Sequence, residues 1–168
     1  MTSRTHSSRM FNLNVTVEFA ASSDVVEIAE LSRKYIEYDL GWHYTPKTVK
    51  ELLKDSEKNV VVARMDKKLA GFGIMTYADQ NANLDLLAVK TRYRRRGVGK
   101  RLVTWLEDVA RTAGIANIYV QVRKVNRGAI TFYTKCGFQV IDQLSGYYRA
   151  TETGVIMCKS IGKMVGVR

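Results

Sequence analysis

The sequence predicts one α/β (α+β) domain, in which about four helices flank a central, mixed but mostly antiparallel sheet of about six or seven strands. Two observations carry this prediction. The 168 residues suit a single core, and segments with the hydrophobic period of a strand alternate with segments with that of a helix. Polar turns separate them, without internal repeats or a linker. The expected order is β-α-α-β-β-β-α-β-α-β-β.

An edge strand and two helices are expected first. Residues 15–20 (VTVEFA) alternate as a half-buried strand does. Asp24 and Glu27 have the spacing of a capping box and precede the first helix. Pro46 stands at the first position of a second, short helix that Thr45 caps. The first helix carries four apolar residues at helical spacing, which are expected to lie in the core: Ile28, Leu31, Tyr35 and Tyr38.

The middle of the chain predicts three strands joined by turns at 66–68 and 78–83. The last of these strands is apolar enough to be central in the sheet. The three ranges are 59–65, 69–77 and 84–89.

The second half predicts two helices that each end at a glycine, Gly114 and Gly137. A strand lies between them and an antiparallel pair follows them. The expected helices are 98–113 and 126–136, and the expected strands are 117–122, 138–144 and 154–160. The domain is therefore expected over 15–162, with 1–14 as a disordered lead-in and 163–168 as a tail.

Positive charge is concentrated in one segment. The net charge is +11, and the run from Lys90 to Arg101 holds seven positive and no negative side chains, so the rest of the chain carries +4. A local cluster indicates a discrete anionic ligand, whereas an evenly basic surface would indicate polyanions in general. A nucleic-acid-binding protein is the remote alternative, and no nucleic acid is expected as a required partner.

Composition argues against several other classes of protein. Cys136 and Cys158 lack the spacing of a zinc site or of a disulfide framework, so no metal is expected and the cytoplasm is the expected location. No apolar run approaches the roughly 18 residues that a membrane span needs, and no membrane partner is expected.

The glycines of the basic segment indicate a phosphate site. The run RRRGVG (94–99) fails the P-loop pattern because Arg101 follows GK, and fails the dinucleotide fingerprint because Leu102 replaces its last glycine. What is left is a strand, a short loop and GxG at the start of a helix. Free N–H groups in that first turn favour an anion, and Gly97 and Gly99 let it approach the main chain.

Together these residues resemble the GNAT superfamily of N-acetyltransferases. RRRGVG fits its Q/R-x-x-G-x-G/A pattern, and LLAV (86–89) precedes it as the family's pantetheine-binding strand does. NRGAITFY (126–133) fits N-x-x-A-x-x-F/L-Y, and Gly137-Phe138 fits the turn that follows. The matched block, 84–138, implies a fold whose splayed central strands form an acetyl-CoA cleft.

Residues near the end of the chain are similar to the amino-terminal protein acetyltransferases, including bacterial enzymes that modify ribosomal proteins. The similar segments are Gly146-Tyr147-Tyr148 and VIMCKSI (155–161). In that group a tyrosine pair grips the N-terminus of the substrate. The resemblance implies that a peptide N-terminus or a small-molecule amine attacks acetyl-CoA directly in a ternary complex.

The resemblance also implies the cofactor contacts. The strand backbone would bind pantetheine, and the N–H groups of the loop would bind the pyrophosphate. Asn126 would contact the cofactor or would only cap its helix, and Tyr133 would protonate the departing thiolate as general acid. The implied cofactor-binding residues are Leu87, Ala88, Val89, Arg94, Arg95, Arg96, Gly97, Val98, Gly99, Lys100, Asn126 and Tyr133.

The general base is the point at which this sequence departs from the family. Two strand positions that often carry a catalytic glutamate are Asn83 and Gln121 here, and an amide is no useful proton acceptor. Asp85 lies on the same strand face as Asn83 and is the candidate base, directly or through water. Alternatively, Asp85 is an exposed strand carboxylate. A missing base favours a weakly basic acceptor, since an α-amine has a pKa of about 7.7–8.0 and a lysine about 10.4.

Acceptor contacts are expected between the first two helices, on the central strands and in the last hairpin. The candidates are Trp42, Tyr44, Asn83, Gln121, Tyr147 and Tyr148. A CoA-binding module without catalysis is the main alternative, because amides occupy positions 83 and 121. A monomer and a homodimer are both compatible with the sequence.

Overall fold

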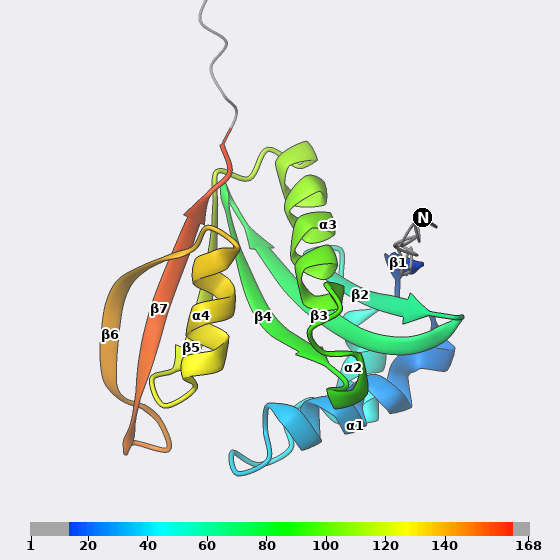
Figure 1. Ribbon diagram of the computed structural model, residues 1–168, viewed down its shortest axis with the longest axis horizontal. Coiled ribbons are helices and arrows are strands. Elements are labelled where there is room, and N and C mark those ends of the chain that lie inside the picture. The colour runs from blue at the N-terminus through cyan, green and yellow to red at the C-terminus, as the bar shows by residue number, and fades with distance from the viewer. Residues whose placement is uncertain (1–13, 163–168) are drawn as a thin grey trace, which may run out of the picture.

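The computed structural model describes residues 14–162, and seven strands and four α-helices lie within that range (Figure 1). Residues 1–13 and 163–168 lie outside the described part, so the predicted lead-in (1–14) and tail (163–168) stay predictions.

The elements follow the predicted order. Two short 3-10 turns, Ser22–Asp24 and Thr91–Tyr93, accompany them. The strands and helices are β1 (Val15–Phe19), α1 (Val25–Tyr35), α2 (Pro46–Leu52), β2 (Lys58–Met65), β3 (Lys68–Ala78), β4 (Asn81–Val89), α3 (Val98–Thr112), β5 (Asn117–Arg123), α4 (Arg127–Lys135), β6 (Gln139–Tyr148) and β7 (Glu152–Ser160).

The strands form one sheet in the order β1-β2-β3-β4-β5-β7-β6. This confirms β1 as an edge strand and β4 as the centre. Only the β4–β5 pair is parallel, so the sheet is mixed but mostly antiparallel, as predicted.

The two central strands separate soon after they meet. β4 and β5 pair over three residues each, Asn81–Asn83 with Asn117–Tyr119. Beyond these pairs the strands diverge, and Figure 1 shows them side by side at one end of the sheet and apart at the other. The predicted splay of the central strands is confirmed.

Helices cover the sheet in two layers. α3 and α4 pack on one face, where their apolar residues join those of β1–β5 and β7 in one core cluster. α1 and α2 pack on the other face against β2, β3 and β4 in a second cluster. Among the described residues, none from β5, β6 or β7 belongs to that second cluster. The α1-side face of these three strands is therefore free of helix packing.

A bulge at Asp85 moves β4 from one core to the other. Met75 pairs with Leu84 and Ile74 with Leu86, so Asp85 is an extra residue without a partner on β3. Before the bulge, Leu84 packs in the α3-side cluster, and after it Leu86 packs in the α1-side cluster.

Three local predictions are wrong. Asp24 and Glu27 form no capping box: Asp24 accepts from the Ala21 N–H at 2.8 Å, and cations far along the chain bind both carboxylates. The predicted turn over 78–83 is too long, because Asp79 adopts a φ of +53° and the chain reverses within two residues. Tyr38 is 63% exposed, because α1 ends at Tyr35.

Candidate active site

The loop Arg94–Lys100, called the phosphate loop below, has the geometry of an anion site. Gly97 adopts a left-handed φ of +79° and caps α3. The first helical bond runs from the Arg101 N–H to the Gly97 carbonyl at 3.0 Å, so the N–H groups just before Arg101 have no carbonyl of the helix to bind. They provide partial positive charge at the start of the helix.

The two glycines of this loop have different structural roles. A Cβ on Gly97 would meet no atom within 4 Å, so this position needs glycine for its φ alone. A Cβ on Gly99 would lie 3.1 Å from the ring of Phe132. Gly99 therefore also lets α3 approach α4, a packing role that the sequence did not reveal.

The basic segment divides into structural and unengaged side chains. Lys90 pairs with Glu27. Arg94 donates to the Val89 carbonyl at 3.0 Å and lies over the Tyr35 ring, and two further arginines bind neighbouring groups. Within residues 14–162, three side chains of the loop make no hydrogen bond or ion pair: Arg95, Arg96 and Lys100. These three are exposed and can bind the phosphates of a cofactor.

Tyr133 lies in the α3-side core on α4. Its side chain is 6% exposed and its ring makes edge contacts with Phe132 and Phe138. Burial raises the pKa of its hydroxyl, with smaller contributions from Cys136 and Tyr148. The phenol is therefore protonated at neutral pH.

Asn126 caps α4, as one of the two sequence alternatives predicted. Its side-chain oxygen accepts from the Ala129 N–H at 3.1 Å. The cap fixes the start of the helix that carries Tyr133.

Five side chains form a hydrogen-bonded row across β2, β3, β4 and β5, called the polar ladder below. It joins three residues of the predicted site, Asn83, Asp85 and Gln121, to two that the sequence did not suggest, Lys58 and Thr76. The four bonds are Lys58 Nζ to Thr76 Oγ1 (2.6 Å), Thr76 Oγ1 to Asp85 Oδ2 (2.5 Å), Asn83 Nδ2 to Asp85 Oδ1 (2.7 Å) and Gln121 Nε2 to Asn83 Oδ1 (2.8 Å).

The polar ladder leaves neither oxygen of Asp85 free of a donor. The carboxylate thus belongs to a network and is not a bare surface group, which excludes the exposed-carboxylate alternative. Its assignment as a base stays a prediction.

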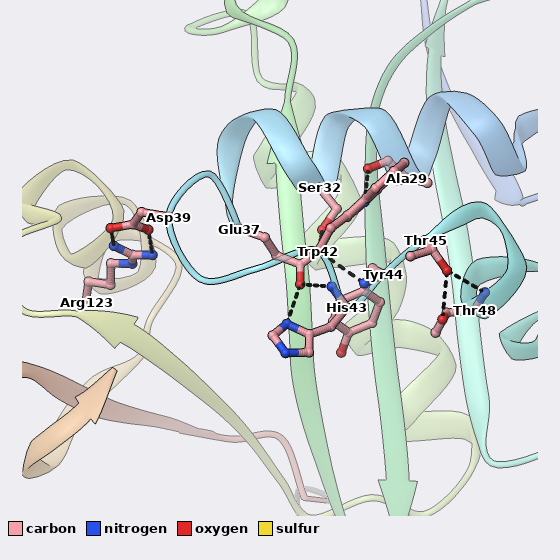
Figure 2. Close-up of polar contacts among 10 residues, drawn as sticks. All are labelled: Ala29, Ser32, Glu37, Asp39, Trp42, His43, Tyr44, Thr45, Thr48 and Arg123. Carbon is pink, nitrogen blue, oxygen red and sulfur yellow. Dashed lines mark hydrogen bonds and ion pairs between the residues drawn. The ribbon is translucent and has the colours of Figure 1, made fainter. Parts of the chain in front are cut away.

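A buried glutamate anchors the loop between α1 and α2 (Figure 2). Glu37 is 6% exposed. Its carboxylate accepts from Ser32 Oγ at 3.0 Å and from the backbone N–H groups of His43 and Tyr44 at 2.9 and 3.2 Å. The loop is therefore held against the end of α1.

The anchored loop places the two aromatic candidates differently. Burial raises the pKa of Tyr44 to about 12, and the negative charges of Asp85 and Glu37 contribute. Tyr44 is half-buried and packs against the α1-side core cluster. Trp42 donates to the Ala29 carbonyl at 3.2 Å and lies under Arg33, so it packs on α1 (Figure 2).

Arg123 joins this loop to the C-terminal hairpin. The Arg123 side chain is 9% exposed, and its guanidinium pairs with Asp39 and lies 3.4 Å from a carboxylate oxygen of Glu152. It also lies over the rings of Tyr38 and Tyr148, at 4.8 and 5.4 Å. The pair with Asp39 is drawn in Figure 2. This junction was missed from the sequence, although Arg123 lies two residues after Gln121 and so on the same strand face.

The predicted tyrosine pair lies at the end of the same hairpin. The rings of Tyr147 and Tyr148 meet edge to face at 4.8 Å. Tyr147 packs against Gly154, where a Cβ would lie 2.9 Å from its ring. Burial raises the pKa of Tyr148 to about 12.

The profile of the acetyltransferase (GNAT) family matches residues 24–138. The chain belongs to this family. Its members use acetyl-CoA as the acyl donor, and the unengaged N–H groups and cations of the phosphate loop fit that cofactor. Within the described residues, no group of three His, Cys, Asp or Glu could hold a metal ion. No helix there is long and apolar enough to cross a membrane.

Two curated relatives are named as N-acetyltransferases. The [ribosomal protein bS18]-alanine N-acetyltransferase of Escherichia coli K12 is 33% identical over 97 residues, which are 56% of this chain and 66% of that protein. The chain thus matches slightly less than two thirds of the length of that relative. The N-alpha-acetyltransferase RimI of Mycobacterium tuberculosis is 28% identical over 141 residues, 82% of this chain and 86% of that protein.

Solved structures show the same fold. Ard1 from Thermoplasma volcanium superposes with a TM-score of 0.79 at 23% identity, over 89% of this chain and 99% of that one. An N-acetyltransferase from Thermoplasma acidophilum, in complex with coenzyme A, gives a TM-score of 0.74 at 22% identity, over 87% and 98%.

Proposed function

We propose that this chain is an acetyl-CoA-dependent N-acetyltransferase that acetylates a primary amine by direct attack in a ternary complex. The observation that carries the proposal is the family match over 24–138. That range contains the phosphate loop, Tyr133 on α4 and the whole polar ladder.

Acetyl-CoA supplies the activated acetyl group. The backbone of Leu87–Val89 binds its pantetheine arm, and the N–H groups of the phosphate loop bind its pyrophosphate. As the C–N bond forms and the C–S bond breaks, Tyr133 gives its proton to the departing thiolate.

The proposed acceptor is the N-terminus of a protein or peptide. Without a glutamate at position 83 or 121, the chain suits an amine that is partly neutral near pH 7, and an α-amine with a pKa of about 7.7–8.0 meets this condition. The names of the two curated relatives agree with this class. Tyr44, Tyr147 and Tyr148 are proposed to line its path.

The test is release of free thiol from acetyl-CoA with a panel of peptides, polyamines and small amines. Peptides with a free N-terminus are expected to give the fastest release, and the same peptides with a blocked N-terminus serve as the matched control. Absence of CoA binding, together with no release for any acceptor, would contradict the proposal.

A CoA-binding module without catalysis is the second candidate, and the amides at Asn83 and Gln121 favour it. It predicts tight CoA binding without turnover across the whole panel. Nucleic-acid binding by Lys90–Arg101 has less support, because four of its seven cationic side chains bind groups of the protein itself. It predicts duplex binding with a steep dependence on salt.

Location and oligomeric state belong to the same proposal. Two free cysteines, Cys136 and Cys158, agree with a reducing cytoplasm. Cell fractionation tests the location, and sedimentation distinguishes a monomer from a homodimer.

A further inference from the structure

The donors and acceptors of the polar ladder can be assigned, and the assignment decides which atom of Gln121 lies at its end. We infer that the side-chain oxygen of Gln121 positions the acceptor amine, and that Asp85 orients the ladder without taking the proton. This inference rests on the proposed acetyl transfer and names the residue that holds the acceptor.

The direction follows from the chemistry of Asp85. An ionised carboxylate only accepts hydrogen bonds, so the Asn83 atom 2.7 Å from Oδ1 is the NH₂ group. The other amide atom of Asn83, its oxygen, then faces Gln121 at 2.8 Å and requires an NH₂ group there. The Gln121 oxygen is thereby left over. Within residues 14–162 it accepts no hydrogen bond.

The other arm of the ladder binds the second oxygen of Asp85. The Thr76 hydroxyl donates to Asp85 and accepts from the ammonium group of Lys58. Both oxygens of Asp85 therefore face donors, and one donor is coupled to a cation. These bonds hold the carboxylate in one orientation, turned toward the ladder, which suits an orienting role.

Gln121 lies at the point where the central strands separate. Backbone pairing of β4 and β5 ends at Asn83 and Tyr119, and Gln121 is the next residue of β5 on the same face. Its bond to Asn83 continues the link between the strands by side chains alone. The amide is half-buried on the sheet face that α1 and α2 leave free beside β4.

The proton inventory follows from this arrangement. The amine enters neutral, having lost its ammonium proton to water, and one of its N–H groups donates to the Gln121 oxygen. Its lone pair forms the C–N bond, and the C–S electron pair leaves on sulfur and takes the Tyr133 proton. The second nitrogen proton then passes to solvent, and solvent reprotonates Tyr133.

A pH profile tests this order of events. The acid limb of kcat/KM should follow the pKa of the acceptor, because no protein group deprotonates the amine. An α-amine and an ε-amine differ by roughly two and a half pKa units, and the limb should move by about the same amount. The ionisable side chains of the ladder itself are Lys58 (β2) and Asp85 (β4). Tyr119 and Arg123 lie two residues on either side of Gln121, on the same face of β5, and the charge of Asp85 also acts on Tyr44 of the α1–α2 loop. The residue of β7 that pairs with Gln121 is Ile156, which does not ionise.

Gln121→Met tests the amide, because it keeps the length of the side chain and removes the acceptor oxygen together with the NH₂ group that binds Asn83. The KM for the acceptor should rise on the order of 10- to 100-fold, while the acid limb keeps its position. Asn81→Ala is the matched control: it removes the Asn117–Asn81 amide bond (3.3 Å) at the other end of the same strand pairing. It should leave KM and the limb unchanged.

Asp85→Asn separates the two roles of the carboxylate. As an orienting group its loss should raise the acceptor KM and leave the limb at the pKa of the acceptor. A fall of kcat by roughly a hundredfold or more, together with loss of the acid limb from the pH profile, would show that Asp85 acts as a base and would overturn the inference. Thermal midpoints close to wild type confirm folding of each variant.

The same experiment separates the inference from the proposed function. A wild-type protein without acetyl transfer to any acceptor overturns both. An active wild type whose acid limb ignores the pKa of the acceptor, or an unchanged KM in Gln121→Met, overturns the inference alone.

Discussion

The phosphate loop and the polar ladder differ in how the chain encodes them. The loop is built from consecutive residues, and its proposed binding groups are backbone N–H groups exposed by a glycine turn and a helix start. The ladder is built from side chains on four strands that lie up to 63 positions apart, from Lys58 to Gln121. A local backbone site tolerates change in the surrounding side chains, whereas each member of a side-chain row needs its partner.

Tyr133→Phe has the largest expected effect and tests the proposed general acid on the cofactor side of the site. If the phenol is the general acid, kcat should fall by roughly 10²–10⁴ while CoA affinity stays near wild type. Tyr77→Phe is the control, because that half-buried hydroxyl binds Asn59 outside the site. Steady-state kinetics and calorimetry of CoA binding measure both quantities. Unchanged kcat in Tyr133→Phe would remove Tyr133 from the mechanism.

Glu37 anchors the loop between α1 and α2, so its substitution is expected to affect acceptor binding. Glu37→Gln replaces one acceptor oxygen of a buried carboxylate by an NH₂ group that faces N–H donors, which should lower the free energy of unfolding by about 1–3 kcal/mol. The acceptor KM should rise as Tyr44 loses its position, and CoA binding should not change. Urea unfolding and kinetics measure the effects, with exposed Glu30→Gln as control. Equal losses of CoA binding and of acceptor binding would contradict a role of Glu37 on the acceptor side alone.

Gly99→Ala tests whether the loop depends on its backbone alone. The new Cβ would press on Phe132, and overpacking should cost about 1–3 kcal/mol of stability and weaken CoA binding. Gly99→Ala with Phe132→Leu should recover much of the loss, because the smaller side chain clears the contact. Thermal unfolding and CoA titration test both variants. If the double variant bound CoA as weakly as the single variant, the loss of binding would come from blocked approach of the phosphate to the backbone.

The smallest effect is expected in the turn of the β6–β7 hairpin. Arg149 and Ala150 both adopt positive φ, +50° and +56°. Ala150→Gly should stabilise by about 0.5 kcal/mol, since relief of left-handed strain, about 1–2 kcal/mol, exceeds the entropy cost of glycine, about 0.4–1 kcal/mol. Ala113→Gly, at a φ of −77°, should destabilise instead. Chemical unfolding compares the two, and a loss in Ala150→Gly would contradict the strain.

Sequence patterns predicted the elements of this chain well because their signals are local. The glycine turn at 97, the Asn126 cap and the apolar run of β4 are each visible within a few residues. The second role of Gly99 was hidden, because Phe132 lies 33 positions away. Arg123 and Lys58 were missed for the same reason, since their partners are brought together only by the fold. Glu37 has nearer partners, five to seven positions away, but two of them are backbone N–H groups of an irregular loop. Tyr38 followed a helical period that the chain leaves at Tyr35.

The bulge at Asp85 has a consequence for how this domain can vary. A strand normally serves one layer with every second residue, but the extra residue shifts the phase of β4 halfway along its length. Even-numbered positions therefore supply both hydrophobic layers in turn. What matters to the two layers is that a residue is present at 85, whichever side chain it carries. Substitution there can alter chemistry without disturbing the core, whereas deletion of one residue would turn half of β4 inside out.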